Sequence, residues 1–181
     1  GGFAATPLST ELFSPMSDLE VDAQNRIVAV TNDQVVRLLD DGSMDAGFGA
    51  GGAVGLDPSS DRSWTCSGDV FGACGLVVAP DGSIIVSGRI SPDGWERNGF
   101  IVIDGAGTTA QFTELCDESA GASDSSVCRP IQNMFVASDG GTSELHFLSN
   151  YVLRTVPLPL GSAPLEPTVV STPLPSMILS T

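Results

Sequence analysis

Short apolar runs separated by polar turns recur along most of the chain. Residues 19–30 align without a gap on residues 76–87, and a segment that starts at Met134 follows the same pattern more loosely. The three segments begin at Leu19, Leu76 and Met134, so their starts are 57 and 58 residues apart. Copies of one unit bury their core between neighbours, so this spacing predicts a repeat protein.

Each copy is predicted to be an antiparallel meander. A first apolar run is followed by a polar turn, a second apolar run and then a third. The turns are Gln24-Asn25, Asp81-Gly82 and Asp139-Gly140-Gly141, and the third runs are residues 35–39, 100–103 and 151–156. Asp-Gly between apolar runs favours a type I′ hairpin turn, in which both central residues have positive φ. The pattern therefore predicts an all-β fold made of antiparallel meander repeats.

One copy carries a longer motif that resembles a known family. Residues 37–54 read R-L-L-D-D-G-S-M-D-A-G-F-G-A-G-G-A-V. This is similar to the delta-60 repeat, a bacterial β-propeller-like repeat with a pattern close to R-L-x-x-D-G-S-L-D-x-x-F-G-x-x-G-x-V. The second copy keeps residues 79–88 and a turn at 103–105 without the Phe-Gly tail, and the third keeps only the hairpin. The resemblance covers about residues 19–156. It implies propeller-like blades and brings no general catalytic motif.

Three blades are fewer than a propeller needs. Closure usually takes about four to eight blades, which also protects their edge strands. Three alternatives follow. Residues 10–13 and the C-terminal segment pair as a fourth blade, an open arc is completed by another chain, or the sequence is a piece of a longer protein.

The predicted repeat domain spans residues 1–156, with repeats near 19–56, 76–112 and 134–156, and residues 157–181 form a different kind of segment. This arm holds six prolines and one charged residue, Glu166. It is predicted to be extended, with edge strands at 168–171 and 176–180. Its apolar positions are the predicted partner-binding residues: Thr168, Val169, Val170, Leu174, Met177, Ile178 and Leu179.

Composition adds constraints on partners. The net charge is −15 and all seven basic residues are arginine, which argues against nucleic acid and anionic membrane surfaces. The bias against lysine fits a GC-rich genome or a surface suited to high salt. No apolar run approaches the roughly 20 residues of a spanning helix, so membrane insertion is not expected.

The four cysteines form two local pairs, Cys66 with Cys74 and Cys116 with Cys128. Four cysteines allow three pairings, and we favour these sequence neighbours because each pair encloses a short polar loop. Neither pair has the Cys-x-x-Cys spacing of zinc sites, and the single histidine, His146, lies in another repeat. Two disulfides would place the protein in an oxidising compartment, as a secreted or cell-surface protein.

Candidate binding residues are few. Trp64 and Trp95 lie in predicted loops, where tryptophan either covers its own core or contacts a ligand such as a glycan. Asp117, Glu118 and Asp124 offer oxygen atoms for calcium, but their spacing does not match an EF-hand and solvated turns are the favoured interpretation. No nucleophile elbow, phosphate loop or zinc motif occurs. We therefore expect no catalytic residue, no metal and no cofactor.

The sequence predicts a non-enzymatic, extracellular structural subunit of a surface fibre or layer. Its arm would dock on a neighbouring subunit, either a copy of the same chain or another surface protein. The alternative is a secreted β-propeller module that binds a glycan or another ligand.

Overall fold

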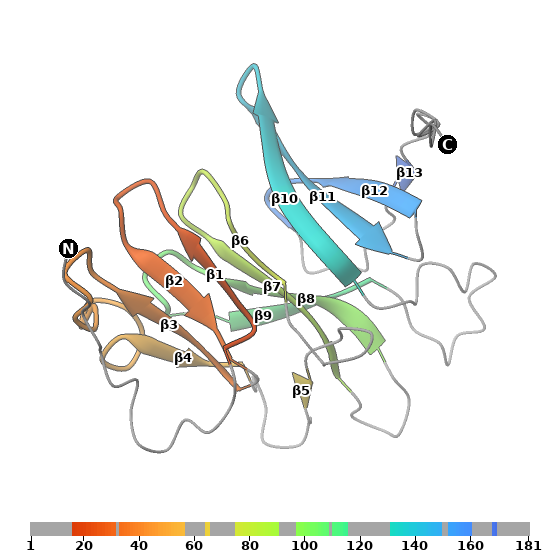
Figure 1. Ribbon diagram of the computed structural model, residues 1–181. Coiled ribbons are helices and arrows are strands. Elements are labelled where there is room, and N and C mark those ends of the chain that lie inside the picture. Colours follow the sequence, from red (N-terminus) through yellow and green to blue (C-terminus); the bar gives the residue numbers. More distant parts are fainter. Residues whose placement is uncertain are drawn as a thin grey trace, which may run out of the picture.

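In the computed structural model, the described residues are 16–31, 33–56, 64–65, 75–90, 97–108, 110–115, 131–149, 152–160 and 168–169. All regular secondary structure within these ranges is β-strand. No helix in this described part is long and apolar enough to cross a membrane. The all-β prediction is confirmed (Figure 1).

The strands form three antiparallel sheets, one for each predicted repeat. Sheet A contains β1 (Asp18–Val21), β2 (Ile27–Val30), β3 (Gln34–Leu38) and β4 (Ala53–Gly55) in chain order. Sheet B contains β5 (Trp64–Thr65), β6 (Leu76–Val78), β7 (Ile84–Ile90), β8 (Arg97–Ile103) and β9 (Ala110–Glu114), with β5 and β6 both paired to β7. Sheet C contains β10 (Ile131–Asp139), β11 (Thr142–Ser149), β12 (Val152–Pro157) and β13 (Thr168–Val169) in chain order. The three-stranded meanders are thus present. Sheets A and C each gain a fourth strand, β4 and β13, and sheet B gains two, β5 and β9. Of these added strands, only β13 overlaps an expected edge strand.

The three sheets share one register. The residue that starts each repeat pairs with its equivalent partner: Leu19 with Ala29, Leu76 with Val86, and Met134 with Phe147. The next strand keeps the same correspondence, because the pairs there are Ile27 with Leu38, Ile84 with Ile103, and Leu145 with Val156. Residues that are opposite each other point to the same face of a sheet. Positions in one sheet can therefore be matched with those in the next.

The hairpin turns differ in type from the prediction in two of three places. Between β6 and β7, the Gly82 N–H donates to the Ala79 carbonyl at 2.8 Å, and the Ala79 N–H donates to the Ser83 carbonyl at 2.8 Å. Gly82 has φ of 86°, while Asp81 does not have positive φ. This is a type I turn followed by one left-handed residue. Pro80 explains the difference, because its ring fixes a negative φ at the first central position.

The β1–β2 turn has the same geometry. Asn25, with φ of 60°, takes the place of the glycine, and its N–H donates to the Asp22 backbone carbonyl at 3.0 Å. The β10–β11 turn is the predicted type I′. Its two central residues, Gly140 and Gly141, have φ of 57° and 91°. Type I′ is possible here because neither glycine carries a Cβ.

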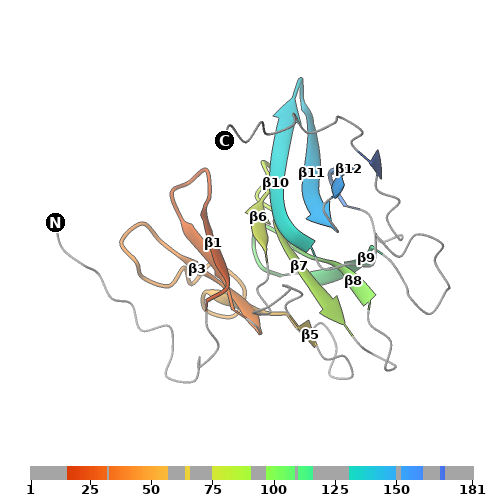
Figure 2. The same ribbon diagram turned by 45° about the vertical axis from the view of Figure 1, so that its right-hand side comes forward.

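Sheet B lies between sheets A and C and is buried on both faces (Figure 2). In sheets B and C, we call the side that points toward the preceding sheet the front face and the other side the back face. In sheet A, the back face is the side that packs on sheet B, and the front face is the opposite side. The A–B core joins the back face of sheet A to the front face of sheet B: Val28, Val30 and Val35 against Leu76, Ile84, Val86, Ile101 and Ile103. The B–C core joins the back face of sheet B to the front face of sheet C: Val77, Ile85 and Phe100 against Leu145, Phe147 and Val156. Burial on both faces explains the unbroken apolar run at the start of β7.

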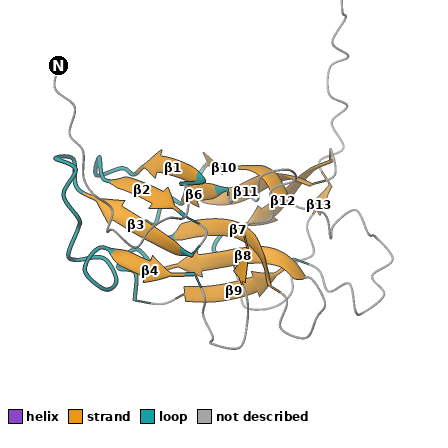
Figure 3. Cartoon of the chain, turned by 60° about the horizontal axis from the view of Figure 1, so that its bottom comes forward, coloured by secondary structure: helices purple, strands orange, loops and turns teal. Residues whose placement is uncertain are grey.

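The first strands of the sheets lie near one another. Strand β6 contacts β1, β2 and β10, and Figure 3 shows β1, β6 and β10 along the same side of the molecule. The Leu76 N–H on β6 donates to Asp18 Oδ2 on β1 at 3.0 Å. A carboxylate of sheet A thus binds a backbone donor of sheet B. The three sheets do not close into a barrel.

Candidate functional site

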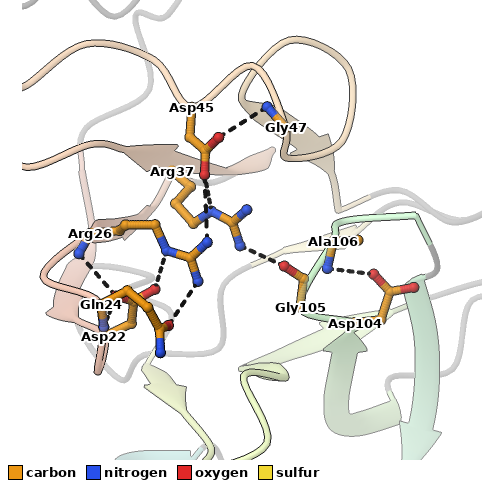
Figure 4. Close-up of polar contacts among 9 residues, drawn as sticks. All are labelled: Asp22, Gln24, Arg26, Arg37, Asp45, Gly47, Asp104, Gly105 and Ala106. Atoms are coloured by element: carbon orange, nitrogen blue, oxygen red, sulfur yellow. Dashed lines mark hydrogen bonds and ion pairs between the residues drawn. The ribbon is translucent and has the colours of Figure 1, made fainter.

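The motif that resembles the delta-60 repeat forms a contact between sheets A and B (Figure 4). Arg37 on β3 is 3% exposed, and its Nε lies 2.8 Å from Asp45 Oδ2. Its Nη1 donates to the Gly105 carbonyl in the β8–β9 turn at 2.6 Å. Its guanidinium also lies 4.4 Å from the ring centre of Phe48, a cation–π arrangement. One arginine therefore links the loop of its own repeat to the next repeat.

A second ion pair extends this network along sheet A. Arg26 Nε lies 2.6 Å from Asp22 Oδ2, and Arg26 Nη1 lies 3.7 Å from Asp45 Oδ2. Burial opposes ionisation of Asp22, but hydrogen bonds from Arg26 and Gln24 hold the pKa of its carboxyl below the usual value. A hydrogen bond from the Gly47 N–H, with the nearby arginines, also lowers the pKa of Asp45. Both carboxylates are therefore favoured in the charged form.

Backbone contact completes this link between sheets. The Gly49 N–H donates to the Ala106 carbonyl at 2.9 Å. A Cβ on Gly107 would lie 2.7 Å from the Gly49 nitrogen and 2.8 Å from the Phe48 ring. The two turns approach so closely that only glycine fits, so this cluster holds the sheets together.

A groove lies between the turns of sheets B and C. Its volume is about 580 Å³, and its lining is acidic, hydroxylic and proline-rich: Ala79, Pro80, Asp81, Gly141, Thr142, Ser143, Glu144, Pro157, Leu158 and Pro159. An adjoining pocket of about 190 Å³ shares Asp81, Leu158 and Pro159 with it. Among the described lining residues there is no arginine, histidine or cysteine. The groove is suited to an uncharged or cationic ligand.

The acids of the groove are partly used by the fold. Asp81 Oδ1 accepts hydrogen bonds from the Ser83 N–H at 2.9 Å and its hydroxyl at 2.6 Å. Glu144 Oε2 lies 3.3 Å from the Thr155 hydroxyl and 3.5 Å from His146 Nε2. Within the described residues, no group of three or more His, Cys, Asp or Glu side chains is placed to hold a metal ion.

The front face of sheet A is apolar at every paired position of its first three strands. Its members, by register, are Leu19, Val21, Ile27, Ala29, Val36 and Leu38. Ala29 and Val36 are each 1% exposed, whereas Leu19 and Val21 on β1 are 52% and 58% exposed. None of the six belongs to either core.

The back face of sheet C carries an aromatic pair. Phe135 on β10 is 51% exposed, and its ring stacks on His146 of β11 with centroids 4.8 Å apart and planes 4° apart. By register this face also contains Leu148, Leu153 and Thr155. Each end of the three-sheet stack therefore exposes large apolar side chains.

Few of the sequence-predicted site residues fall in the described part of the chain. Trp64, expected in a loop, lies in β5, where it pairs with Ile90. Thr168 and Val169 pair with Thr155 and Arg154 of β12, within their own sheet. The others lie outside the described residues: Cys66, Cys74, Trp95, Cys116, Asp117, Glu118, Asp124, Cys128, Val170, Leu174, Met177, Ile178 and Leu179. The disulfides and arm docking stay predictions.

The sequence pattern did not predict the residues that link the sheets or those exposed on the outer faces of sheets A and C. Arg37 and Asp45 were recognised as part of a motif, but their shared contact with Gly105 was not foreseen. The exposed pair Leu19 and Val21 had a visible signal, because the alignment matches them with the core residues Leu76 and Val78.

No family model matches this chain, and no curated protein matches it either.

Proposed function

We propose that this protein is a non-enzymatic structural subunit of an extracellular assembly, with its three sheets acting as consecutive propeller-like blades. The observation that carries the proposal is the front face of sheet A. It repeats the apolar pattern that sheet B buries against sheet A, yet Leu19 and Val21 are more than half exposed. Exposed apolar surface of this kind marks an interaction site.

The use of the acidic side chains supports a structural role. Asp22, Asp41, Asp81 and Asp104 each accept a hydrogen bond from a backbone N–H two residues further along the chain. Such contacts are the chemistry by which aspartate builds turns. The recurring acids thus shape the hairpins. The proposed extracellular location rests on the two predicted disulfides.

Light scattering coupled to size-exclusion chromatography tests the proposal. Over a range of protein concentrations, we expect the mass to rise from that of one chain to that of an assembly of copies. A single-chain mass at every concentration, under oxidising conditions, contradicts the proposal.

The groove between sheets B and C favours a second candidate, a secreted ligand-binding module. Pockets of this size with a few polar groups are typical of small-molecule sites. A glycan array tests this function, with Glu144→Gln as the variant and Asp139→Asn, an exposed acid outside the groove lining, as the matched control. Glycan binding that Glu144→Gln abolishes, by a chain that stays monomeric, would favour this candidate over assembly.

A further inference from the structure

We propose that the groove between the turns of sheets B and C binds a linear polyamine. Its ammonium groups would contact the carboxylates of the groove, and its methylene chain would pack on leucine and proline side chains. The inference does not need the proposed assembly to be correct, and it gives the second candidate function a specific class of ligand. It follows from how the groove walls are held, from the hydrogen-bonding groups that they offer and from their charge.

The walls of the groove are fixed by contacts within the chain. On the side of sheet C, the Leu158 N–H donates to the Ser143 carbonyl at 2.9 Å, and Leu158 and Leu160 pack against the B–C core. On the side of sheet B, the Asp81 carboxylate accepts two hydrogen bonds from Ser83. Walls that are already ordered reduce the entropy cost of binding. The groove volume of about 580 Å³ lies within the usual range for small-molecule sites.

The lining offers many hydrogen-bond acceptors, whereas several of its donors are missing or already used. The Ser83 hydroxyl donates to Asp81 at 2.6 Å, and the Thr142 hydroxyl donates to the Asp139 carbonyl at 2.8 Å. The Leu158 N–H is used as well. Three lining residues are prolines, which have no backbone N–H: Pro80, Pro157 and Pro159. A ligand that brings donors therefore fits this lining better than one that needs them.

The charge of the lining requires these donors to be cationic. Asp81 borders both the groove and the adjoining pocket, Glu144 borders the groove, and Asp104 borders the pocket. None of the described lining residues is basic, and the chain has a net charge of −15. An ionised carboxylate has about four acceptor sites, so Asp81 and Glu144 can accept more hydrogen bonds than the fold uses. An ammonium group, with three donors and no acceptor, complements them.

The apolar part of the lining indicates what joins the ammonium groups. Leu158 and Pro159 lie between the groove and the pocket, and Leu160 also lines the pocket. Methylene chains pack well on such side chains, as the stem of a lysine does. Sugar hydroxyls and peptide backbones would also need donors from the protein, which the prolines do not supply. A linear polyamine therefore matches the carboxylates and the apolar residues together.

Calorimetric titration with spermidine tests the proposal. In low-salt buffer, we expect the wild type to bind one spermidine per chain, and we expect the affinity to fall as salt is added, because salt screens exposed charges. Octanediol is the matched probe, since it has an uncharged hydroxyl at each end of a chain of the same length. Octanediol should not bind. A wild type that does not bind spermidine overturns the proposal, and so does one that binds octanediol equally well.

Two variants separate the groove from general attraction to an acidic protein. Asp81→Asn removes one charge from the lining but keeps an oxygen for Ser83, and the affinity for spermidine should fall about tenfold. Asp139→Asn removes the same charge from an exposed acid outside the lining and should change the affinity by less than about twofold. Equal losses in the two variants overturn the proposal.

Circular dichroism checks that each variant keeps its β-structure, and Glu144→Gln takes the place of Asp81→Asn if that variant does not. Binding to the glycan array without binding of spermidine overturns the polyamine assignment and leaves the second candidate function standing. Light scattering without spermidine decides the assembly function separately, whatever the titrations show.

Discussion

Arg37 and Asp45 meet with 2.8 Å between Nε and Oδ2, and the same guanidinium donates to the Gly105 carbonyl of the following sheet. Both residues belong to the motif at residues 37–54 that resembles the delta-60 repeat, and both lie where sheets A and B meet. The contact between repeats is therefore partly polar, with the ring of Phe48 beneath the arginine.

Replacing Arg37 should strongly destabilise the fold. Arg37→Ala removes the closer of the two arginines that pair with Asp45 and the side-chain donor to the Gly105 carbonyl, so we expect the free energy of unfolding to fall by about 3 kcal/mol. Urea denaturation measures the change. Arg37→Lys keeps the positive charge beside Asp45 but cannot reach Asp45 and the Gly105 carbonyl together with one planar group. Its loss of stability should therefore be smaller than that of Arg37→Ala. Equal losses in the two variants would contradict this account.

Stability should decrease as the pH falls below about 4, the usual carboxyl pKa. The pKa values of Asp22, Asp41 and Asp45 are lowered in the folded state. Their stabilisation is present above the unfolded-state pKa and is lost as the pH falls through the folded-state pKa. Burial raises the pKa of Glu20, which acts in the opposite sense and stabilises only at low pH. Thermal unfolding from pH 7 to pH 2.5 measures the balance.

Asp22→Asn provides the control for this pH dependence. The variant should be less stable than the wild type at pH 7 and should lose less stability on acidification, because asparagine does not titrate. A wild type whose unfolding temperature stays constant down to pH 2.5 would contradict the assignment.

The glycine of the β6–β7 turn should be needed for its backbone conformation alone. Gly82 has φ of +86°, and a Cβ added there meets nothing within 4 Å. Gly82→Ala should therefore cost about 1 kcal/mol, the usual penalty for a left-handed residue with a side chain. Gly55, which also has open space but ordinary φ, is the control, and Gly55→Ala should be neutral or slightly stabilising. Chemical denaturation of both variants measures the difference.

Gly107 should be needed for a second reason. Its φ of +71° is similar to that of Gly82, but its Cβ would clash with the Gly49 nitrogen and the Phe48 ring. Gly107→Ala should therefore cost about 1–3 kcal/mol more than Gly82→Ala, and denaturation curves measure the difference. Equal costs would mean that the two turns separate without penalty.

The sequence predicted the meanders because apolar alternation and turn residues act locally. The type I′ turn predicted at Asp81-Gly82 was wrong, because Pro80 fixes a negative φ at the first central position of the turn. The added strands β4 and β9 have three and five residues and start at alanine, and β9 has polar residues on both sides of Phe112, so neither carries the apolar run that marks the other strands. They depend on pairing with a neighbouring strand.

The candidate site was harder to predict because it depends on how repeats meet. Arg37 and Gly105 lie 68 positions apart in the chain, and no local pattern relates them. The end faces follow from register, which fixes the side to which each residue points. Leu19 and Val21 resemble core residues in the sequence, and only the packing of the sheets shows that neither core includes them.

Because sheet B is covered on both sides, the repeats should tolerate mutation unequally. Successive side chains at Ile84, Ile85 and Val86 each enter a core, so a saturation screen of this strand should reject polar replacements at all three. On β1 of sheet A, Leu19 and Val21 are more than half exposed, so hydrophilic replacements at these two positions should be depleted only when selection acts on self-association. A screen scored separately for folding and for self-association should thus find the fewest tolerated substitutions in the middle repeat. The substitutions tolerated on β1 should differ most between the two scores.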